Sequence, residues 1–475
     1  MRKTKIICTL GPATSDSEAI KKVLSSGANA VRLNFSHGTH EEHRVRLESF
    51  KKARDELGVP AASILDTKGP QIRIGTFTTG RVTLNAGATF TITNADVSGD
   101  ENRVSVTYKN LYKELKPGVR ILLDDGLIEL RVEQITGCDI VCTVVNGGDI
   151  SNRKSMNIPG VSIGFPMLSP EDETDLRFAA ENGMDFIAAS FIRSRGDVLA
   201  IRNALKTYGG ADIKIIAKIE NREGLNNFSE IVEEADAVMV ARGDLGVEID
   251  AWEVPILQKK IISETKIMGK PVVVATQMLD SMIRNPRPTR AEVSDVANAV
   301  YDGASCVMLS GETAAGKYPV ESVVTLDKTL RAAEAAIDFW ERFREGHFER
   351  KSSISDAISH ACCTTAMDLG ASAVITVTTS GYTARMISRF RPQCPIVALT
   401  ESERVRRQLS ISWGVTPEAG KRLSSTDEVF AAGIETALQT KIVTSGDTVV
   451  LTAGVPIGIS GTTNLIKVQQ IPSSF

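Results

Sequence analysis

The chain has 475 residues, too many for a single ordinary domain, so two or three domains are expected. Its net charge of −3 provides no overall positive field for nucleic acid, and aromatic residues at 5 % are too few for a base-stacking surface. Seven cysteines without a C-x-x-C pair, and no apolar stretch as long as a membrane span, indicate a reduced, cytoplasmic protein.

Short apolar runs alternate with amphipathic stretches over the first 340 residues. Continuous Val, Ile and Ala runs are typical of strands buried on both faces, as in a parallel sheet. Eight such runs with helices between them favour an α/β fold of the (β/α)8 TIM barrel type over a doubly wound sheet. One helix is expected over 39–58, ending at Gly58. Its expected buried face contains Val45, Leu47, Phe50 and Leu57.

The connection between the third and fourth apolar runs has a different pattern of apolar and polar residues. Apolar and polar residues alternate there, and Asp125-Gly126 is typical of a hairpin turn. Because βα loops stand over the active-site face of a barrel, a module inserted in one of them predicts a lid. After a charged stretch that predicts a linker or exposed helix, a separate α/β domain follows. The predicted division is barrel 1–68, β-rich lid 69–165, barrel 166–340 and C-terminal α/β domain 341–475.

Polar side chains stand at the end of nearly every predicted barrel strand. One polar strand end is ordinarily a helix cap or a turn. Cations and carboxylates at almost every end indicate a site, because the carboxyl ends of barrel strands converge on one face. The set comprises Pro12, Arg32, Asn34, Ser36, Asp66, Thr67, Ser190, Lys218, Glu220, Arg242, Asp244, Thr276, Ser310 and Glu312.

The residue types in this set predict a class of chemistry. Glu220 and Asp244 are hard oxygen ligands suited to a divalent ion such as Mg²⁺ or Mn²⁺. Arg32, Lys218 and Arg73 suit phosphoryl oxygens. Carboxylates, cations and a metal without an obvious nucleophile indicate phosphoryl transfer by positioning and electrostatics.

Seven motifs stand in order along the chain: RLNFSHG, LDTKGP, KIEN, MVARGDLG, ATQMLDSM, PRPTRAEVSDVANAV and MLSGETAAGKYP. Together they resemble the pyruvate kinase family, and the resemblance runs from residue 3 to the C-terminus. It implies a barrel with an inserted lid and a C-terminal α/β domain, assembled as a homotetramer. It also implies phosphoryl transfer from phosphoenolpyruvate to ADP, giving ATP and pyruvate in glycolysis. A metal-dependent enolpyruvate aldolase or lyase on a related barrel is the alternative, which explains neither the lid nor the C-terminal domain.

The resemblance implies roles for the matched residues, in three groups. The catalytic and substrate-binding residues are Arg32, Lys218, Gly243, Asp244 and Thr276. The nucleotide-binding residues are Pro12, Asn34, His37, Arg73 and Lys154. The Mg²⁺ ligands are Glu220 and Asp244, and the K⁺ ligands are Asn34, Ser36, Asp66 and Thr67.

Gln71 departs from the family pattern. The resemblance implies Glu at this position in K⁺-dependent relatives and Lys in K⁺-independent ones. A neutral amide cannot replace the cation, and the four K⁺ ligands are present, so K⁺ dependence is predicted. Alternatively, Gln71 only forms a hydrogen bond near the lid hinge and says nothing about cations.

The C-terminal domain contains a candidate effector site. A strand ends there in hydroxyl residues and a helix follows, which is typical of an anion site, and the Gly-rich stretch 452–464 is expected to close over it. The resemblance implies a sugar phosphate or nucleotide effector, although Tyr382 and Val429 replace basic residues of some relatives, which disfavours fructose 1,6-bisphosphate. Two ordinary turns are the alternative. The matched residues are Thr378, Thr379, Ser380 and Thr383.

Overall fold

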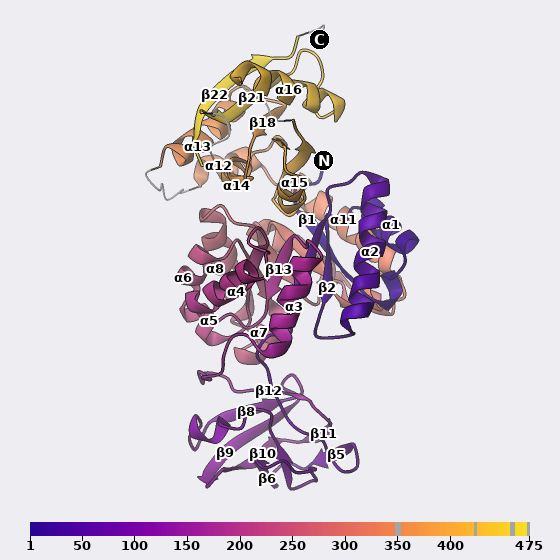
Figure 1. The fold of residues 1–475 in the computed structure, drawn as a ribbon, viewed down its shortest axis with the longest axis vertical. Coiled ribbons are helices and arrows are strands. Elements are labelled where there is room, and N and C mark those ends of the chain that lie inside the picture. The colour runs from indigo at the N-terminus through magenta and orange to yellow at the C-terminus, as the bar shows by residue number, and fades with distance from the viewer. Residues whose placement is uncertain (347–352, 422–424, 457–460, 473–475) are drawn as a thin grey trace.

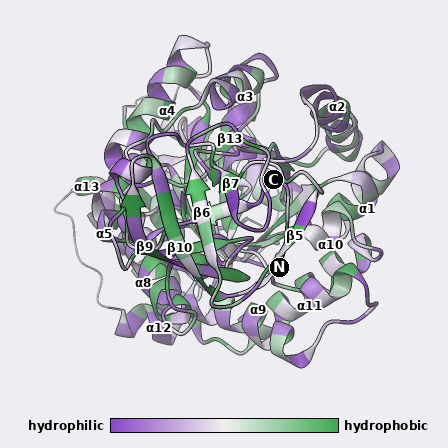
Figure 2. Ribbon diagram, turned by 90° about the horizontal axis from the view of Figure 1, so that it is seen from below, coloured by the Kyte–Doolittle hydropathy of each residue, from purple (hydrophilic) through white to green (hydrophobic). Residues whose placement is uncertain are grey.

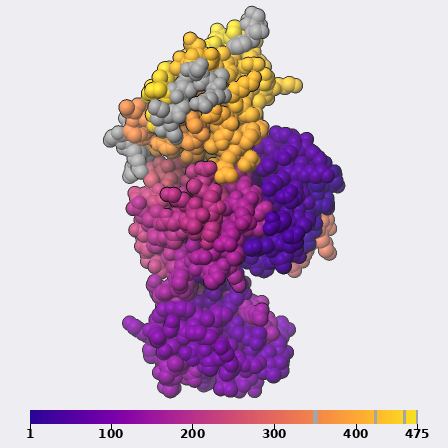
Figure 3. Space-filling view, in the orientation of Figure 1, coloured from indigo at the N-terminus to yellow at the C-terminus, as the bar shows by residue number. Residues whose placement is uncertain are grey.

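The computed structural model describes residues 1–346, 353–421, 425–456 and 461–472. Three bodies follow one another along the longest axis, with the barrel between the C-terminal domain and the lid (Figure 1). A narrow waist joins the barrel to the lid, and the face in Figure 3 is hollowed between the lid and the N-terminal part of the barrel. None of the described helices is both long and apolar enough to cross a membrane.

Eight parallel strands close into a barrel, which confirms the (β/α)8 prediction and excludes the doubly wound sheet. Their order around the barrel is β1-β17-β16-β15-β14-β13-β3-β2. The insertion of the lid between β3 and β13 leaves these two strands paired side by side. The strands are β1 (Lys5–Leu10), β2 (Ala30–Asn34), β3 (Ala62–Asp66), β13 (Phe186–Ala189), β14 (Lys214–Ile219), β15 (Ala237–Ala241), β16 (Val272–Ala275) and β17 (Cys306–Leu309).

Helices surround the barrel, as the view from the lid end shows (Figure 2). They lie in the connections between strands, as the right-handed βα topology requires. The α-helices are α1 (Ser17–Ser25), α2 (His40–Leu57), α3 (Pro170–Glu181), α4 (Arg195–Thr207), α5 (Arg222–Asn226), α6 (Phe228–Glu234), α7 (Arg242–Glu248), α8 (Val254–Ile267), α9 (Arg290–Asp302), α10 (Gly311–Ala314) and α11 (Pro319–Ala335). Two short 3-10 helices, η1 (Pro12–Thr14) and η3 (Asp280–Ile283), complete the set.

The helix expected over 39–58 is α2, and its cap is as predicted. Gly58 ends it in the left-handed conformation, with φ at 66°. Leu47 and Phe50 are buried, but the prediction for the other two apolar residues was wrong, since Val45 is 55 % exposed and Leu57 38 % exposed. A single narrow stripe of α2 faces the barrel, and neither residue falls on it.

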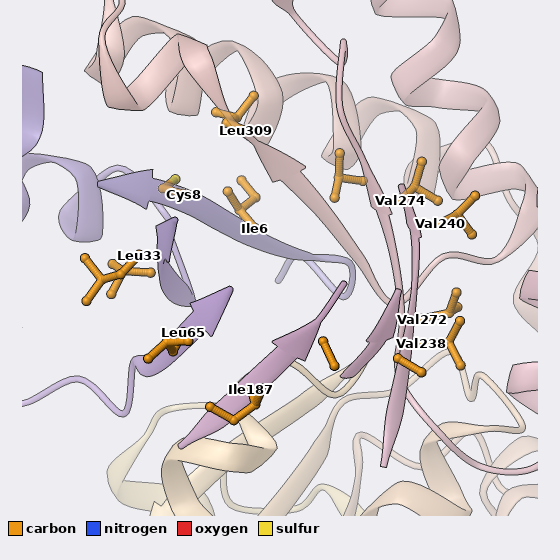
Figure 4. Close-up of a cluster of buried hydrophobic side chains, with 14 of the residues drawn as sticks. Ile6, Cys8, Leu33, Leu65, Ile187, Val238, Val240, Val272, Val274 and Leu309 are labelled. Carbon is orange, nitrogen blue, oxygen red and sulfur yellow. The ribbon is translucent and has the colours of Figure 1, made fainter. Parts of the chain in front are cut away.

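Successive residues of a barrel strand enter two separate cores. In β1, Ile6 and Cys8 pack outward against the helices, a core that Figure 4 shows in close-up, whereas Ile7 between them packs inside the barrel. The inner core also contains Ile411 of the C-terminal domain. The thiol of Cys306, at the start of β17, donates to the Ile411 carbonyl at 3.1 Å. The C-terminal domain therefore closes the amino end of the barrel, and we call this side chain the Ile411 plug.

The lid is a β-module, as predicted. Its main sheet has the order β4-β12-β8-β9-β10-β6-β7, and β5 pairs separately with β11. Asp125-Gly126 forms the expected turn, with φ of 54° and 88°. The elements are β4 (Ile72–Arg73), β5 (Arg81–Leu84), β6 (Thr89–Thr93), β7 (Arg103–Ser105), η2 (Leu111–Lys113), β8 (Arg120–Leu123), β9 (Ile128–Thr136), β10 (Asp139–Asn146), β11 (Gly148–Ser151) and β12 (Ser155–Asn157).

The C-terminal domain has a five-stranded sheet in the order β20-β19-β18-β21-β22. Four of its strands were expected, but β20 was not; it contains Pro417, which an edge strand tolerates because it needs fewer N–H donors. The strands are β18 (Ala373–Val377), β19 (Ile396–Thr400), β20 (Val415–Ala419), β21 (Thr448–Gly454) and β22 (Thr463–Gln470). The helices are α12 (Phe339–Glu345), α13 (Ile354–Asp368), α14 (Tyr382–Ser388), α15 (Glu403–Leu409) and α16 (Thr426–Gln439).

The stretch expected to be a linker or exposed helix contains α12, and part of it lies outside the described residues. Phe343 of α12 is only 6 % exposed and packs in the core of the C-terminal domain. The predicted boundary between 340 and 341 therefore falls inside a helix. The division of the chain at 69, 166 and 341 stays a prediction.

The Ile411 plug predicts that the barrel depends on the C-terminal domain for stability. Ile411→Ala would leave a cavity at the closed end of the barrel, so we expect the free energy of unfolding in urea to fall by about 3 kcal/mol. Leu127→Ala is the control, because Leu127 is 68 % exposed and should cost little. Equal losses in the two variants would contradict the role of the plug.

Candidate active site

The carboxylate of Asp66, at the end of β3, lies between two cations from other strands. Nε of Arg32 on β2 donates to Oδ2 at 2.6 Å, and Nζ of Lys218 on β14 donates to Oδ1 at 2.9 Å. All three side chains are buried. Burial alone would raise the pKa of Asp66, but the charges of Arg32 and Lys218 outweigh it and lower that pKa. Asp66 therefore stays ionised and fixes both cations.

Lys218 has two further partners. Its ammonium donates to Oγ of Ser190 at 2.7 Å and lies 3.0 Å from Oε1 of Glu220. Burial opposes the charged form, but Asp66 and Glu220 outweigh it and raise the pKa of Lys218. A permanently charged ammonium is thus held at the carboxyl end of β14.

Glu220 follows β14 and is fully buried. Its Oε2 accepts from the N–H of Phe191 at 2.6 Å, and Phe191 has the left-handed φ of 57°. Its Oε1 makes no hydrogen bond within the described part of the chain, because the nearby Lys218 ammonium lies outside hydrogen-bonding geometry. Burial raises the pKa of Glu220 to about 7, and the charge of Asp244 adds to the effect. A cation could therefore replace the proton on this carboxylate.

The carboxylates fit a divalent ion that keeps other ligands. Asp244, in the first turn of α7, is close enough to Glu220 to affect its titration. The described residues contain no group of three or more His, Cys, Asp or Glu side chains that could hold a metal. Two carboxylates leave the remaining positions to water and substrate oxygens, which is how Mg²⁺ commonly binds.

Thr276 follows β16 in a strained conformation, with φ at 68°. Its hydroxyl accepts from the N–H of Gly243 at 2.9 Å and donates to the Ala275 carbonyl at 2.7 Å. Arg242 holds the turn, donating to the Thr276 carbonyl and to Asp295, each at 2.7 Å. The left-handed conformation of Thr276 and the two hydrogen bonds donated by Arg242 hold the Thr276 hydroxyl beside the first turn of α7.

The four residues expected to bind K⁺ come from two neighbouring strand ends. Asn34 and Asp66 are register partners at the ends of β2 and β3. Oδ1 of Asn34 accepts from the N–H of Ser36 at 3.2 Å, and Oγ1 of Thr67 accepts from the N–H of Ser190 at 3.3 Å. The set is therefore assembled around Asp66, although both of its oxygens also accept from cations.

The two cations expected to bind nucleotide phosphates lie together on the lid. Arg73 is on β4 and Lys154 immediately precedes its partner strand β12, and the N–H of Ile74 donates to the Lys154 carbonyl at 3.0 Å. Lys154 pairs with Asp124 at 2.8 Å. The guanidinium of Arg73 donates to Oε1 of Gln71. Gln71 thus forms a hydrogen bond near the lid hinge, as its second interpretation expected, and this contact does not test K⁺ dependence.

The remaining nucleotide candidates lie on the barrel. Pro12 opens η1 directly after β1. His37 lies in the turn after β2, where its carbonyl lies 2.8 Å from Nε2 of His43. Both are at the carboxyl ends of strands, on the same side as Asp66. Arg73 instead donates to the Arg153 carbonyl and Lys154 pairs with Asp124, both within the lid.

The effector candidates surround the start of α14, which has only seven residues. Oγ1 of Thr383 lies 2.6 Å from Oγ1 of Thr463, so this hydroxyl already has a partner. Thr378 is buried and Thr379 is exposed. Residues 457–460 of the stretch expected to close over the site lie outside the described residues.

The sequence analysis missed three groups that position site residues through hydrogen bonds. One of its candidates, Glu312, instead bonds to backbone N–H groups of nearby loops. Oγ1 of Thr9 accepts from Arg32 at 3.2 Å, and its position as a polar residue in an apolar strand was the available signal. The N–H of Phe191 and the carboxylate of Asp295 had no comparable signal. Glu312 instead accepts from the N–H groups of Leu279 and Ser310 at 3.0 and 2.7 Å, which makes it part of the loop structure.

Comparisons with known proteins cover almost the whole chain. The family model for the pyruvate kinase barrel domain matches residues 1–323, and that for the pyruvate kinase alpha/beta domain matches 356–469. A pyruvate kinase from Clostridium acetobutylicum is 48 % identical over 99 % of this chain and 100 % of its own. One from Geobacillus stearothermophilus is 47 % identical over 99 % of this chain and 80 % of its own. A crystal structure of a pyruvate kinase from Cryptosporidium parvum superposes with a TM-score of 0.94 at 38 % identity, covering 99 % of this chain and 96 % of that one.

The contacts of Asp66 predict a large cost for removing its charge. Asp66→Asn would leave Arg32 and Lys218 buried without their shared carboxylate, so we expect the free energy of unfolding to fall by about 3 kcal/mol. The exposed pair of Lys68 and Glu171, 3.0 Å apart, provides the control, and Glu171→Gln should change stability within experimental error. Urea unfolding of both variants checks this, and a stable Asp66→Asn protein would contradict it.

Proposed function

Because the chain belongs to the pyruvate kinase family, and so transfers a phosphoryl group from phosphoenolpyruvate to ADP in glycolysis, we propose a role for each part of its site. The observation that carries the proposal is the buried network in which Asp66 fixes Arg32 and Lys218 at 2.6 and 2.9 Å. Among the described residues no contact favours the aldolase or lyase alternative, and the relatives named above are pyruvate kinases.

Arg32 and Lys218 bind the phosphoryl group during its transfer. The group passes through a loose transition state whose charge is spread over three oxygens, so positioned cations are the main catalytic contribution. Asp66 and Ser190 already hold the Lys218 ammonium, and Asp66 and Thr9 hold the Arg32 guanidinium. The cations therefore need little reorganisation when charge develops.

Glu220 and Asp244 hold Mg²⁺, or Mn²⁺ in its place. The free Oε1 of Glu220 and its raised pKa support a cation ligand at this position. When bound, the divalent ion neutralises charge shared between the enolpyruvate and the phosphoryl oxygens. The Phe191 N–H keeps the Glu220 carboxylate oriented through its other oxygen.

The first turn of α7 binds the substrate carboxylate. The N–H groups of Gly243 and Asp244 lie in the first turn of α7, where backbone N–H groups have no acceptor within the helix and anions are favoured. In the structure the Gly243 N–H donates to the Thr276 hydroxyl. A substrate carboxylate would compete for this N–H and accept from the Thr276 hydroxyl as well. Thr276 also lies on the route by which a proton reaches the carbon of the enolate.

ADP binds between the barrel and the lid. Arg73 and Lys154, adjacent on the lid, meet its phosphates when the lid closes over the barrel face. Pro12, His37 and Asn34 lie beside the nucleoside on the barrel side. The hollow between the two bodies in Figure 3 supports a nucleotide at this position.

Potassium, assembly, location and regulation complete the proposal. K⁺ binds at Asn34, Ser36, Asp66 and Thr67, where it supplies the charge that neutral Gln71 lacks.

A homotetramer is supported by Trp252 and Ile256, next to and within α8, which are 74 % and 68 % exposed. A cytoplasmic location agrees with seven unpaired cysteines. A sugar phosphate or nucleotide binds the loop of Thr378, Thr379, Ser380 and Thr383.

Lys218→Met tests the phosphoryl role. The substitution keeps the length of the side chain and removes its charge, so we expect kcat to fall by about 10³-fold or more while phosphoenolpyruvate affinity changes only a few-fold. Lys214→Met, at the other end of the same strand, is the control and should retain most of the activity. Turnover and equilibrium binding measure both effects. A Lys218→Met enzyme within tenfold of the parent would refute the assignment.

The K⁺ proposal is tested by pyruvate formation from phosphoenolpyruvate and ADP with Mg²⁺, in potassium and in tetramethylammonium buffer. We expect activity to require K⁺, because Gln71 is neutral and the Arg73 guanidinium that donates to it is assigned to the nucleotide phosphates. In potassium buffer, removal of Mg²⁺ with a chelator should also abolish turnover. Equal rates in the two buffers would show that this neutral variant works without the ion, with the kinase assignment unaffected.

A further inference from the structure

A small cavity between the barrel and the C-terminal domain is lined by five cations and, among the described residues, by no carboxylate. Two come from the barrel, at the end of α8 and in the loop before β16. Three come from the C-terminal domain, in α14 and just after it. The five are Lys266, Lys270, Arg385, Arg389 and Arg391.

Contacts within the protein account for only part of this charge. Arg389 pairs with Asp356 at 2.6 Å. Nζ of Lys270 donates to the carbonyls of Val232, Glu233 and Ala235 at 2.6–2.7 Å, which fixes it at the end of α6, where the charges of Asp236 and Glu234 offset part of its own. Burial lowers the pKa of Lys266 to about 8, and the charge of Arg391 lowers it further. Burial also lowers the pKa of Arg391 to about 9, although Cys306 and Glu334 act in the opposite direction. The junction therefore carries a local excess of positive charge.

Three polar atoms of residues that line the cavity have no hydrogen-bond partner in the part of the chain that the structure describes. They are Nε of Arg389, Nε of Arg391 and Oγ of Ser412. Arg389 and Ser412 are 7 % and 2 % exposed, so bulk water has little access to their polar atoms. A buried donor without an acceptor costs about 1–3 kcal/mol. Both arginine atoms can only donate, which indicates a ligand that accepts.

The size of the cavity restricts the ligand. Its volume is about 10 Å³, roughly the space of one water-sized sphere. A phosphate ester or a nucleotide does not fit. A water molecule also fits, but it carries no charge and would leave the cations of the lining without compensation. A monatomic anion accepts from every donor at once and also neutralises charge.

We propose that this cavity binds a single chloride-sized anion, held by Lys266, Arg391 and Ser412, which joins the barrel to the C-terminal domain. Lys266 belongs to the barrel, and the other two belong to the C-terminal domain. Ser412 directly follows the Ile411 plug, so the anion lies beside the residue that closes the barrel. The proposal is independent of the catalytic roles assigned above.

The test compares thermal unfolding of the whole protein in sodium chloride and sodium gluconate at constant ionic strength. An anion that binds only the folded state stabilises it, so we expect a saturable rise of about 2 °C in chloride. Ser412→Ala removes a hydroxyl that has no partner in the described residues and should reduce the rise. Lys266→Met should abolish the rise and raise the midpoint in gluconate, because it removes the repulsion that the anion relieves.

Lys260→Met is the matched control on the same helix, since Lys260 is exposed and does not line the cavity. Chloride shifts that are equal in all variants would refute the proposal, as they would reflect anions bound elsewhere. A Lys266→Met protein that is less stable in gluconate would also refute it, by assigning that lysine a purely structural role.

Bromide locates the site directly. Crystals of the parent protein soaked in bromide should show an anomalous peak beside Ser412, and crystals of Lys266→Met should not. An empty cavity in the parent would overturn the proposal. A variant-sensitive thermal shift with inorganic phosphate instead of chloride would overturn the size argument and identify an oxyanion as the ligand.

Discussion

The arrangement of the site depends on one buried carboxylate that two cations share. Arg32 and Lys218 would repel each other at the end of a dry barrel, and Asp66 allows both to be charged in one place. The three residues come from strands whose positions are fixed only when the barrel closes, with β13 between β3 and β14. Barrel closure, the ionic network and the position of these two cations are therefore a single structural requirement.

This network also explains why neighbouring carboxylates behave differently. Asp66 receives two charged donors, and its pKa is lowered. Glu220 receives one backbone N–H and a poorly oriented ammonium, and burial raises its pKa. Both oxygens of Asp66 accept from cations, whereas Oε1 of Glu220 accepts no hydrogen bond from the residues that the structure describes. The difference arises from the number and orientation of donors, since both side chains are buried.

Much of the fold, and the gathering of polar residues at one end of the barrel, could be predicted from the sequence, because apolar runs and polar strand ends are local patterns. Lys218, Glu220 and Asp244 were singled out in this way. Phe191 and Asp295 were not singled out, because the roles of a backbone N–H and of a carboxylate on α9 depend on contacts with residues far away in the sequence. Val45 was misplaced for a related reason: periodicity cannot tell how wide a stripe of a helix its neighbours cover.

The Ile411 plug has a consequence for how such enzymes can be cut and recombined. A residue of the last domain fills the inner core of the first, so the domains are not interchangeable modules even though each has its own sheet. A barrel excised before α12 would expose an unfilled hole at its base, and a chimera of two relatives would need side chains of matching volume at this one position. Inheritance of the two domains as a unit follows from packing alone.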